Sequence, residues 1–139
     1  MSAKDKFHYA VKRGLEKEQW IITQDPLTIK FEDKDLVEID LAADRLLGAE
    51  RSGVKIAVEI KSFLNDSPMY DFHLALGQLL NYRLALAANE PDRILYLAVP
   101  FTAYESFFRR PLPKASIRQH QIKLILYNQV DEVIVKWID

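Results

Sequence analysis

Residues 36–63 read LVEIDLAADRLLGAERSGVKIAVEIKSF, and this stretch decides the fold. Two runs of alternating apolar residues flank a gap that contains Gly48 and Gly53, a pattern that predicts a β-hairpin or a short β-meander. Because side chains alternate between the two faces of a strand, Glu59 and Lys61 are expected on the same side.

Asp40 lies late in the first of these two runs. If the two strands pair, its carboxylate would lie beside that of Glu59, and Lys61 would share the same face. Carboxylate oxygens suit Mg²⁺, a hard cation that prefers octahedral oxygen ligands and keeps several waters. The pattern is therefore typical of a metal-dependent phosphodiesterase, in which the lysine would orient the attacking water or help to deprotonate it.

The Glu-X-Lys tripeptide is a weak signal by itself, because surface strands often alternate these residues. Its context is stronger, since residues 56–60 are apolar apart from Glu59 and predict a central, mostly buried strand. A charge on such a strand is unfavourable unless it is paired or bound to a metal. The alternative is a solvated ion pair between Glu59 and Lys61 on an edge strand. Asp40 is a second carboxylate in an apolar strand, which favours a functional site.

The composition predicts one domain over residues 1–139, with 49% hydrophobic and 28% charged residues. The formal net charge of −1 gives no overall basic signal for nucleic acid, although a local basic patch could serve. The absence of cysteine excludes disulfides, thiolate metal sites and cysteine catalysis. No apolar run approaches the roughly 20 residues of a membrane span, and residues 1–14 lack a signal-peptide core, so we expect a cytoplasmic protein.

The rest of the chain predicts alternating helices and strands. Helices are expected over residues 3–18, 68–88 and 102–108, with a further helical turn over 115–121. Additional strands are expected over residues 20–23, 27–31, 93–100, 122–127 and 132–137. A helical crossover between the Glu59 strand and the strand at 93–100 should leave the two strands parallel. The prediction is an α/β or α+β domain whose mixed central sheet is flanked by helices.

Two helices carry further candidate residues. His8, Lys12 and Glu16 are spaced by four and stack along one face of the first helix, which is either a solvated face or brings Glu16 or His8 toward the acidic residues. Gln78 and Tyr82 are neighbours on the long helix, and the alternative for them is a surface glutamine and a tyrosine at the edge of the core.

The best basic group for phosphate contacts is Arg109, Arg110, Lys114 and Arg118. Residues 109–114 are predicted to form a rigid basic connection between helices. The alternative is a solvated basic loop.

The order αβββαβ, with Asp40 on one strand and Glu-X-Lys on the next, resembles the PD-(D/E)XK, or restriction-endonuclease-like, nuclease superfamily. The proline of that motif is absent, since Ile39 precedes Asp40. Gln78 and Tyr82 resemble the Gln-X-X-X-Tyr motif of several of its branches. More narrowly, the chain resembles the XisH family, the fdxN element excision controlling factors of cyanobacteria. The segments that carry this resemblance are DKFHYAVKRGLEKEQWIITQDPLTI, EIDLAAD, AVEIKSF and GQLLNYRLAL.

The resemblance implies a restriction-endonuclease-like fold and a role in programmed DNA excision during heterocyst differentiation, beside a site-specific recombinase. The implied catalytic set is Asp40, Glu59, Lys61, Gln78 and Tyr82, to which Glu16 of the first helix could add a further ligand for the metal or a second metal. The implied metal, Mg²⁺ or Mn²⁺, would be held by Asp40, Glu59 and the backbone carbonyl of Ile60.

Three functions remain open at this point. The first is a Mg²⁺-dependent DNA endonuclease, for which a homodimer is plausible because cutting both strands needs two active sites. The second is a catalytically inactive accessory factor that binds DNA, a recombinase or a small partner protein. The third is a toxin–antitoxin or defence nuclease, which shares the chemistry of the first.

Overall fold

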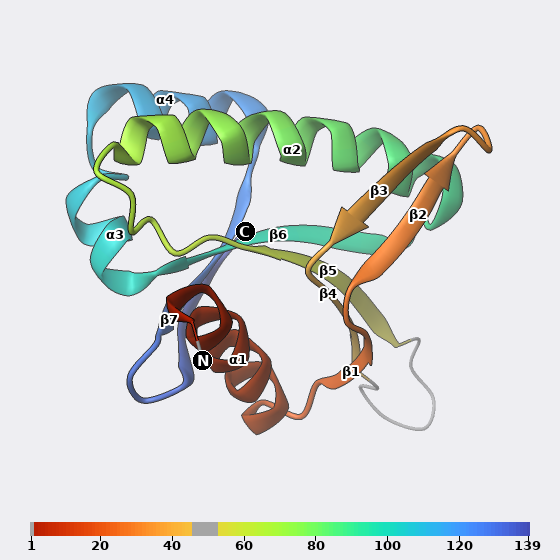
Figure 1. Cartoon of the computed structure of the whole chain (residues 1–139), viewed down its shortest axis with the longest axis horizontal. Coiled ribbons are helices and arrows are strands. Elements are labelled where there is room, and N and C mark those ends of the chain that lie inside the picture. The colour runs from red at the N-terminus through yellow and green to blue at the C-terminus, as the bar shows by residue number, and fades with distance from the viewer. Residues whose placement is uncertain (1, 46–52) are drawn as a thin grey trace.

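The computed structural model describes residues 2–45 and 53–139. Its elements in chain order are α1 (Ala3–Lys17), β1 (Ile21–Gln24), β2 (Leu27–Phe31), β3 (Asp35–Ile39), β4 (Leu41–Arg45), β5 (Val54–Ile60), α2 (Pro68–Asn89), β6 (Arg93–Pro100), α3 (Phe101–Ser106), α4 (Pro111–His120), β7 (Lys123–Asn128) and β8 (Val133–Ile138). A six-stranded sheet in the order β1-β4-β5-β6-β7-β8 forms the centre, and β2 and β3 form a separate two-stranded sheet (Figure 1).

The sheet is mixed, as the sequence predicts. β4 and β5 pair antiparallel, with Leu41 opposite Val58, which confirms the predicted pairing. The turn expected at Gly48 lies outside the described residues. β5 pairs parallel with β6, and β6 pairs parallel with β7. The long helix α2 therefore connects two parallel neighbours.

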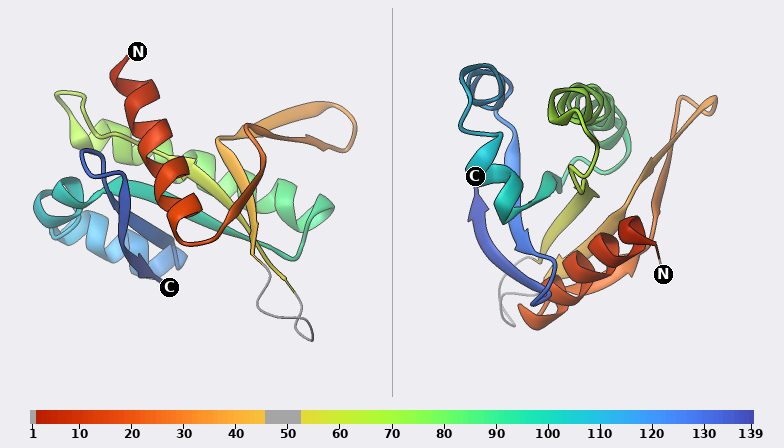
Figure 2. Two further views of the ribbon diagram at one scale, coloured as in Figure 1. Left: turned by 90° about the horizontal axis from the view of Figure 1, so that it is seen from below. Right: turned by 60° about the vertical axis from the view of Figure 1, so that its left-hand side comes forward.

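Helices cover both faces of the central sheet (Figure 2). On one face α1 packs against side chains such as Ile56 and Val58. On the other face α2 packs over the opposite side of the strands, where Ala57 is buried. The alternation along β5 places Glu59 on the same face as Ala57, toward α2. Within the described parts of the chain, no helix is both long enough and apolar enough to cross a membrane.

The sequence predicts a single strand through the apolar run around Asp40. The structure instead has two strands there, β3 and β4. The chain bends at Asp40, and residues on its two sides belong to different sheets: β3 pairs with β2, whereas β4 joins the central sheet. Ile39 is buried on the side of the β2–β3 sheet, and Leu41 is buried in the central sheet. A uniform apolar pattern does not reveal such a division, because both halves have buried partners.

The division also adds a hairpin to the predicted αβββαβ core. β1, β4 and β5 supply its three strands in the central sheet, and the β2–β3 hairpin is inserted between the first and the second. The hairpin packs its inner face against α2, where Leu27, Ile29 and Ile39 meet Leu86.

The basic connection predicted over residues 109–114 is wrong in part. Residues from Pro111 onward form α4, which begins with proline at its first turn. Proline is tolerated there because the first backbone N–H groups of a helix have no partner inside the helix. Pro111 and Pro113 both lie in the first turn of α4, where a helix accepts them.

Gly14 lies in the interior of α1, where glycine is unfavourable relative to alanine, and it has a packing role. A Cβ atom at Gly14 would lie 3.0 Å from the Cδ1 of Ile134 and 3.1 Å from its backbone nitrogen. Lys17, one turn later, donates to the carbonyls of Asp131 and Glu132 at 3.1 and 2.9 Å. The glycine therefore lets α1 lie directly against the backbone of β8.

We predict that Gly14→Ala lowers the free energy of unfolding by about 1 to 3 kcal/mol, because the added methyl group meets backbone that moves only with β8. The matched control is Gly77→Ala in α2, where an added Cβ meets nothing within 4 Å. There the higher helix propensity of alanine should raise stability by up to about 1 kcal/mol. Urea unfolding of dilute protein measures both changes, and equal effects of the two substitutions would contradict the packing role.

Candidate functional site

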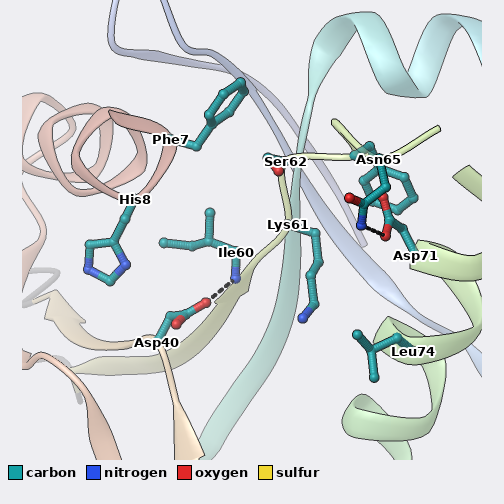
Figure 3. Close-up of a pocket in the computed structure, with 10 residues that line it drawn as sticks. Phe7, His8, Asp40, Ile60, Lys61, Ser62, Asn65, Asp71 and Leu74 are labelled. Atoms are coloured by element: carbon teal, nitrogen blue, oxygen red, sulfur yellow. Dashed lines mark hydrogen bonds between the residues drawn. The ribbon is translucent and has the colours of Figure 1, made fainter. Parts of the chain in front are cut away.

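A pocket of about 190 Å³ lies beside the C-terminal end of β5, between α1 and α2. Figure 3 shows α1 contributing Phe7 and His8 on one side and α2 contributing Asp71 and Leu74 on the other. The remaining lining residues are Asp40, Ile60, Lys61, Ser62, Phe63 and Asn65. Ligands of sheets with parallel strands commonly bind at the carboxyl ends of those strands, so this pocket is the candidate site.

Asp40 and Glu59 are held side by side by reciprocal hydrogen bonds. The amide of Ile60 donates to Asp40 Oδ2 at 2.8 Å, and the amide of Asp40 donates to Glu59 Oε1 at 3.3 Å (Figure 3 draws the first). Each carboxylate thus accepts a backbone N–H from the segment that carries the other acid. The predicted proximity of the two acids is present in the structure.

Glu59 is only 5% exposed. Its burial, followed by repulsion from the Asp40 carboxylate, raises its pKa from 4.5 to about 7, although Lys61 acts in the opposite direction. The ammonium of Lys61 lies 3.4 Å from Glu59 Oε2, on the same face of the strand as predicted. The pair is largely buried, so the solvated edge-strand alternative does not describe it.

The backbone around Lys61 is fixed on both sides. Its amide donates to the carbonyl of Ala98 at 3.0 Å, and its carbonyl accepts a hydrogen bond of 3.0 Å from the hydroxyl of Tyr127. Burial, and then the charge of Asp40, raise the pKa of Tyr127, so the hydroxyl keeps its proton and donates. Phe63, two residues later, has φ 55°, a left-handed conformation that is uncommon for a non-glycine residue.

Tyr82 of α2 lies close enough to the acids for their charges to act on it. Tyr82 is 8% exposed, and its pKa is raised by burial and then by the charges of Glu59 and Asp40. Among the described residues, the buried Oε1 of Gln78 has no hydrogen-bond partner. Tyr82 therefore lies on the helix face that covers the acidic residues, and the spacing of four places Gln78 one turn away on that face, with one polar atom left unsatisfied.

Glu16 is not brought to the pocket. Its side chain is exposed and lies 3.4 Å from the guanidinium of Arg13. His8, the other residue proposed from the first helix, lines the pocket instead and contacts Asp25 Oδ1 through Nε2 at 2.9 Å.

The pocket contains polar residues that the sequence did not single out. Asn65 donates to Asp71 Oδ1 at 2.6 Å, and Asp71 is only 8% exposed. An acid in the first turn after a serine cap is ordinary helix chemistry. The sequence therefore offered no signal that Asp71 faces a pocket.

The predicted basic group lies elsewhere. Arg109 and Lys114 line a different groove together with Lys136, and this groove shares no lining residue with the acidic pocket. Arg109 pairs with Glu105, and Arg110 lies over the ring of Phe107. Arg118 is exposed farther along α4. The predicted basic residues are thus not part of the pocket that contains Asp40.

The donor atoms at the pocket fit a hard divalent cation. In the described ranges, no group of three or more His, Asp or Glu side chains is arranged to hold a metal. Mg²⁺ is nevertheless commonly bound through one or two carboxylates with waters as its other ligands. Asp40 and Glu59 offer two such carboxylates. The charge of Asp40 opposes the ionisation of the buried Glu59, and a bound cation would relieve this repulsion.

These features define an α+β protein with a paired-carboxylate site at the end of a central strand. The chain belongs to the XisH family: the family model described as XisH protein matches residues 1–135. This confirms the predicted family, whereas placement in the PD-(D/E)XK superfamily stays a prediction.

Two crystal structures are similar over nearly the whole chain. An XisH family protein from Nostoc punctiforme PCC 73102 is 48% identical with a TM-score of 0.85, over 97% of this chain and 100% of that one. A protein from Anabaena variabilis described as an fdxN element excision controlling factor is also 48% identical, with a TM-score of 0.87, over 97% of this chain and 99% of that one. A search of curated proteins gave no match.

We predict that Glu59→Gln stabilises the metal-free protein increasingly as the pH rises. A folded pKa of about 7 exceeds the value of 4.5 for the free side chain, so the native state binds the proton more tightly. Ionisation of Glu59 therefore lowers the free energy of unfolding progressively between these two values, by up to about 3 kcal/mol above pH 7.

The measurement is urea unfolding of wild type and Glu59→Gln with a chelator present, from pH 4 to pH 8. The stability difference should grow through this interval. Glu16→Gln makes the same chemical change at an exposed position and is the matched control. A constant difference for Glu59→Gln as well would contradict the raised pKa.

Proposed function

We propose that this chain is a Mg²⁺- or Mn²⁺-dependent endonuclease of the PD-(D/E)XK type that acts on DNA in the control of element excision. The observation that carries the proposal is the fixed Asp40–Glu59 pair with Lys61 on the same face. Membership of the XisH family and the description of the Anabaena variabilis relative as an fdxN element excision controlling factor support the context of excision.

Asp40 and Glu59 would hold the metal, together with the backbone carbonyl of Ile60. A bound Mg²⁺ would polarise the phosphate and lower the pKa of a water molecule. Asp40 is half-buried and lines the pocket, whereas Glu59 lies beneath it. One acid is thus accessible from the pocket, and the other supplies negative charge from the protein interior.

Lys61 would position the attacking water or a phosphate oxygen. Its side chain lines the pocket and is 19% exposed, so its ammonium can reach both Glu59 and a ligand. Its backbone is held by Ala98 and Tyr127, which limits the positions that the side chain can take.

Gln78 and Tyr82 would complete the site from α2. The Gln78 Oε1 that lacks a partner among the described residues is available to accept a hydrogen bond from a water or from Lys61. Tyr82 keeps its proton beside two carboxylates because their charges and its burial raise its pKa. Its hydroxyl therefore remains a donor at neutral pH.

The second candidate function is an accessory factor that binds DNA, a recombinase or a small partner protein without cutting. One observation favours it: Arg109 and Lys114 line a groove that is separate from the acidic pocket. DNA held by these residues would not necessarily reach Asp40.

We predict that Asp40→Asn abolishes Mg²⁺ and Mn²⁺ binding in calorimetric titration, because it removes one charge of the pair while preserving the acceptor for the Ile60 amide. Nicking of supercoiled plasmid should fall with it by at least about 100-fold. Lys61→Met should keep metal binding and lose nicking, since the ammonium acts on water or phosphate. Glu16→Gln should leave both unchanged.

Each outcome has a distinct meaning. Unchanged metal affinity in Asp40→Asn would contradict the site. Metal binding by wild type without nicking, tested on duplex, nicked and single-stranded DNA, would favour the accessory factor. In that case Arg109→Ala and Lys114→Ala should weaken DNA binding, while Asp40→Asn should not.

A further inference from the structure

The outward face of α2 lacks the charges that a solvent-facing helix usually carries. The whole of α2 contains only two Asp, Glu, Lys or Arg residues, Asp71 and Arg83. Asp71 is buried, and Arg83 is half-buried and donates to the carbonyl of Gln121 at 2.8 Å. Tyr70 and Leu84 on this face are each 63% exposed. Large apolar side chains exposed on a face with so few charges are typical of a protein contact surface, so this face is suited to contact with another protein surface.

The exposed residues of this face are arranged symmetrically around Gly77. Tyr70 lies seven residues before Gly77, and Leu84 lies seven residues after it. His73 and Asn81, both exposed, lie four residues on either side. If two copies of α2 cross antiparallel at Gly77, each Tyr70 meets the other copy's Leu84. Such self-complementarity is the requirement of a two-fold interface.

Gly77 fits the crossing point. A Cβ at this position would meet nothing within 4 Å in the single chain, so packing within the protein does not require a glycine there. Glycine in the middle of a helix is unfavourable relative to alanine. Its absence of a side chain instead allows a second helix to approach closely.

A groove next to Leu84 can receive the partner's tyrosine. This groove has a volume of about 330 Å³ and lies between α2 and the β2–β3 hairpin, lined by Phe31, Asp35, Val37, Asn81, Leu84 and Ala85. Its walls are mostly apolar, with Asn81 and Asp35 as polar groups. An antiparallel copy places its Tyr70 near Leu84, toward the C-terminal end of α2. There the tyrosine ring would contact Phe31 and Val37, and its hydroxyl would reach Asn81 or Asp35.

A dimer needs a larger contact area than α2 alone offers. The helix has 22 residues and is about 33 Å long, so a strip roughly 10 Å wide covers about 330 Å². A stable interface needs about 800 Å² from each partner. The dimer therefore has to bury the flanks of α2 as well, which are α4 on one side and the β2–β3 hairpin on the other (Figure 2).

From this arrangement we infer that the outward face of α2 binds a second copy of the same chain, in an antiparallel two-fold dimer that crosses at Gly77. The dimer buries Tyr70 of each protomer against Leu84 and the hairpin groove of the other. This inference does not rest on the proposed activity, because neither metal nor DNA takes part in the contact.

The first test is mass by sedimentation equilibrium. Wild type is expected to be a dimer at micromolar concentration, and Leu84→Asp should weaken the dimer at least 100-fold, because it places a carboxylate against the partner's tyrosine. Leu84 is mostly exposed in the single chain, so this variant should keep its fold by circular dichroism. Val130→Asp makes the same kind of change at another apolar side chain, which is 81% exposed on the β7–β8 turn, and this variant should remain dimeric.

The second test uses the absence of cysteine in the chain. Gly77→Cys should form an intermolecular disulfide in most of the protein under mild oxidation, because the two positions meet on the two-fold axis. A mixture of Tyr70→Cys and Leu84→Cys chains should form the mixed cross-link in preference to either symmetric one. A monomeric wild type, or symmetric Leu84→Cys cross-links in excess of mixed ones, would overturn the inference.

Discussion

The site depends on the pair of hydrogen bonds that join the bend at Asp40 to the end of β5. The amide of Ile60 donates to the Asp40 carboxylate, and the amide of Asp40 donates to Glu59. These bonds fix the point where the chain leaves the β2–β3 hairpin and enters the central sheet. The same contacts thus determine the path of the backbone and the relative positions of the two acids.

This arrangement places charge where folding alone would not favour it. Glu59 is buried beside a second carboxylate, and its pKa of about 7 expresses the unfavourable energy of ionising it there. Lys61 offsets this energy only in part. A buried acid that is both desolvated and next to a like charge is typical of sites that bind or transform a ligand, which is why this pair carries the functional argument.

Much of this site could be predicted from the sequence because it follows the period of a strand. Glu59 and Lys61 are two residues apart, which fixes them on one face of β5, and Gln78 and Tyr82 are four apart on α2. The bend at Asp40 could not be predicted, since apolar residues continue through it. The presence of Asp71 in the pocket and the absence of Glu16 from it could not be predicted either. Helical spacing shows which residues share a face of a helix, but not what that face packs against.

The contact of α1 with β8 has a consequence for the order in which the protein assembles. Lys17 and the carbonyl of Glu132, which immediately precedes β8, are separated by 115 residues in the sequence, and Gly14 packs against β8 itself. On the ribosome, α1 is therefore made long before β8, the strand that completes its binding surface. Phe7, on the same helix, packs edge-on against Tyr127 of β7, so the contacts of α1 are completed only by the last two strands of the chain. The wall of the acidic pocket that Phe7 and His8 form is therefore held in part by the segment that is synthesised last.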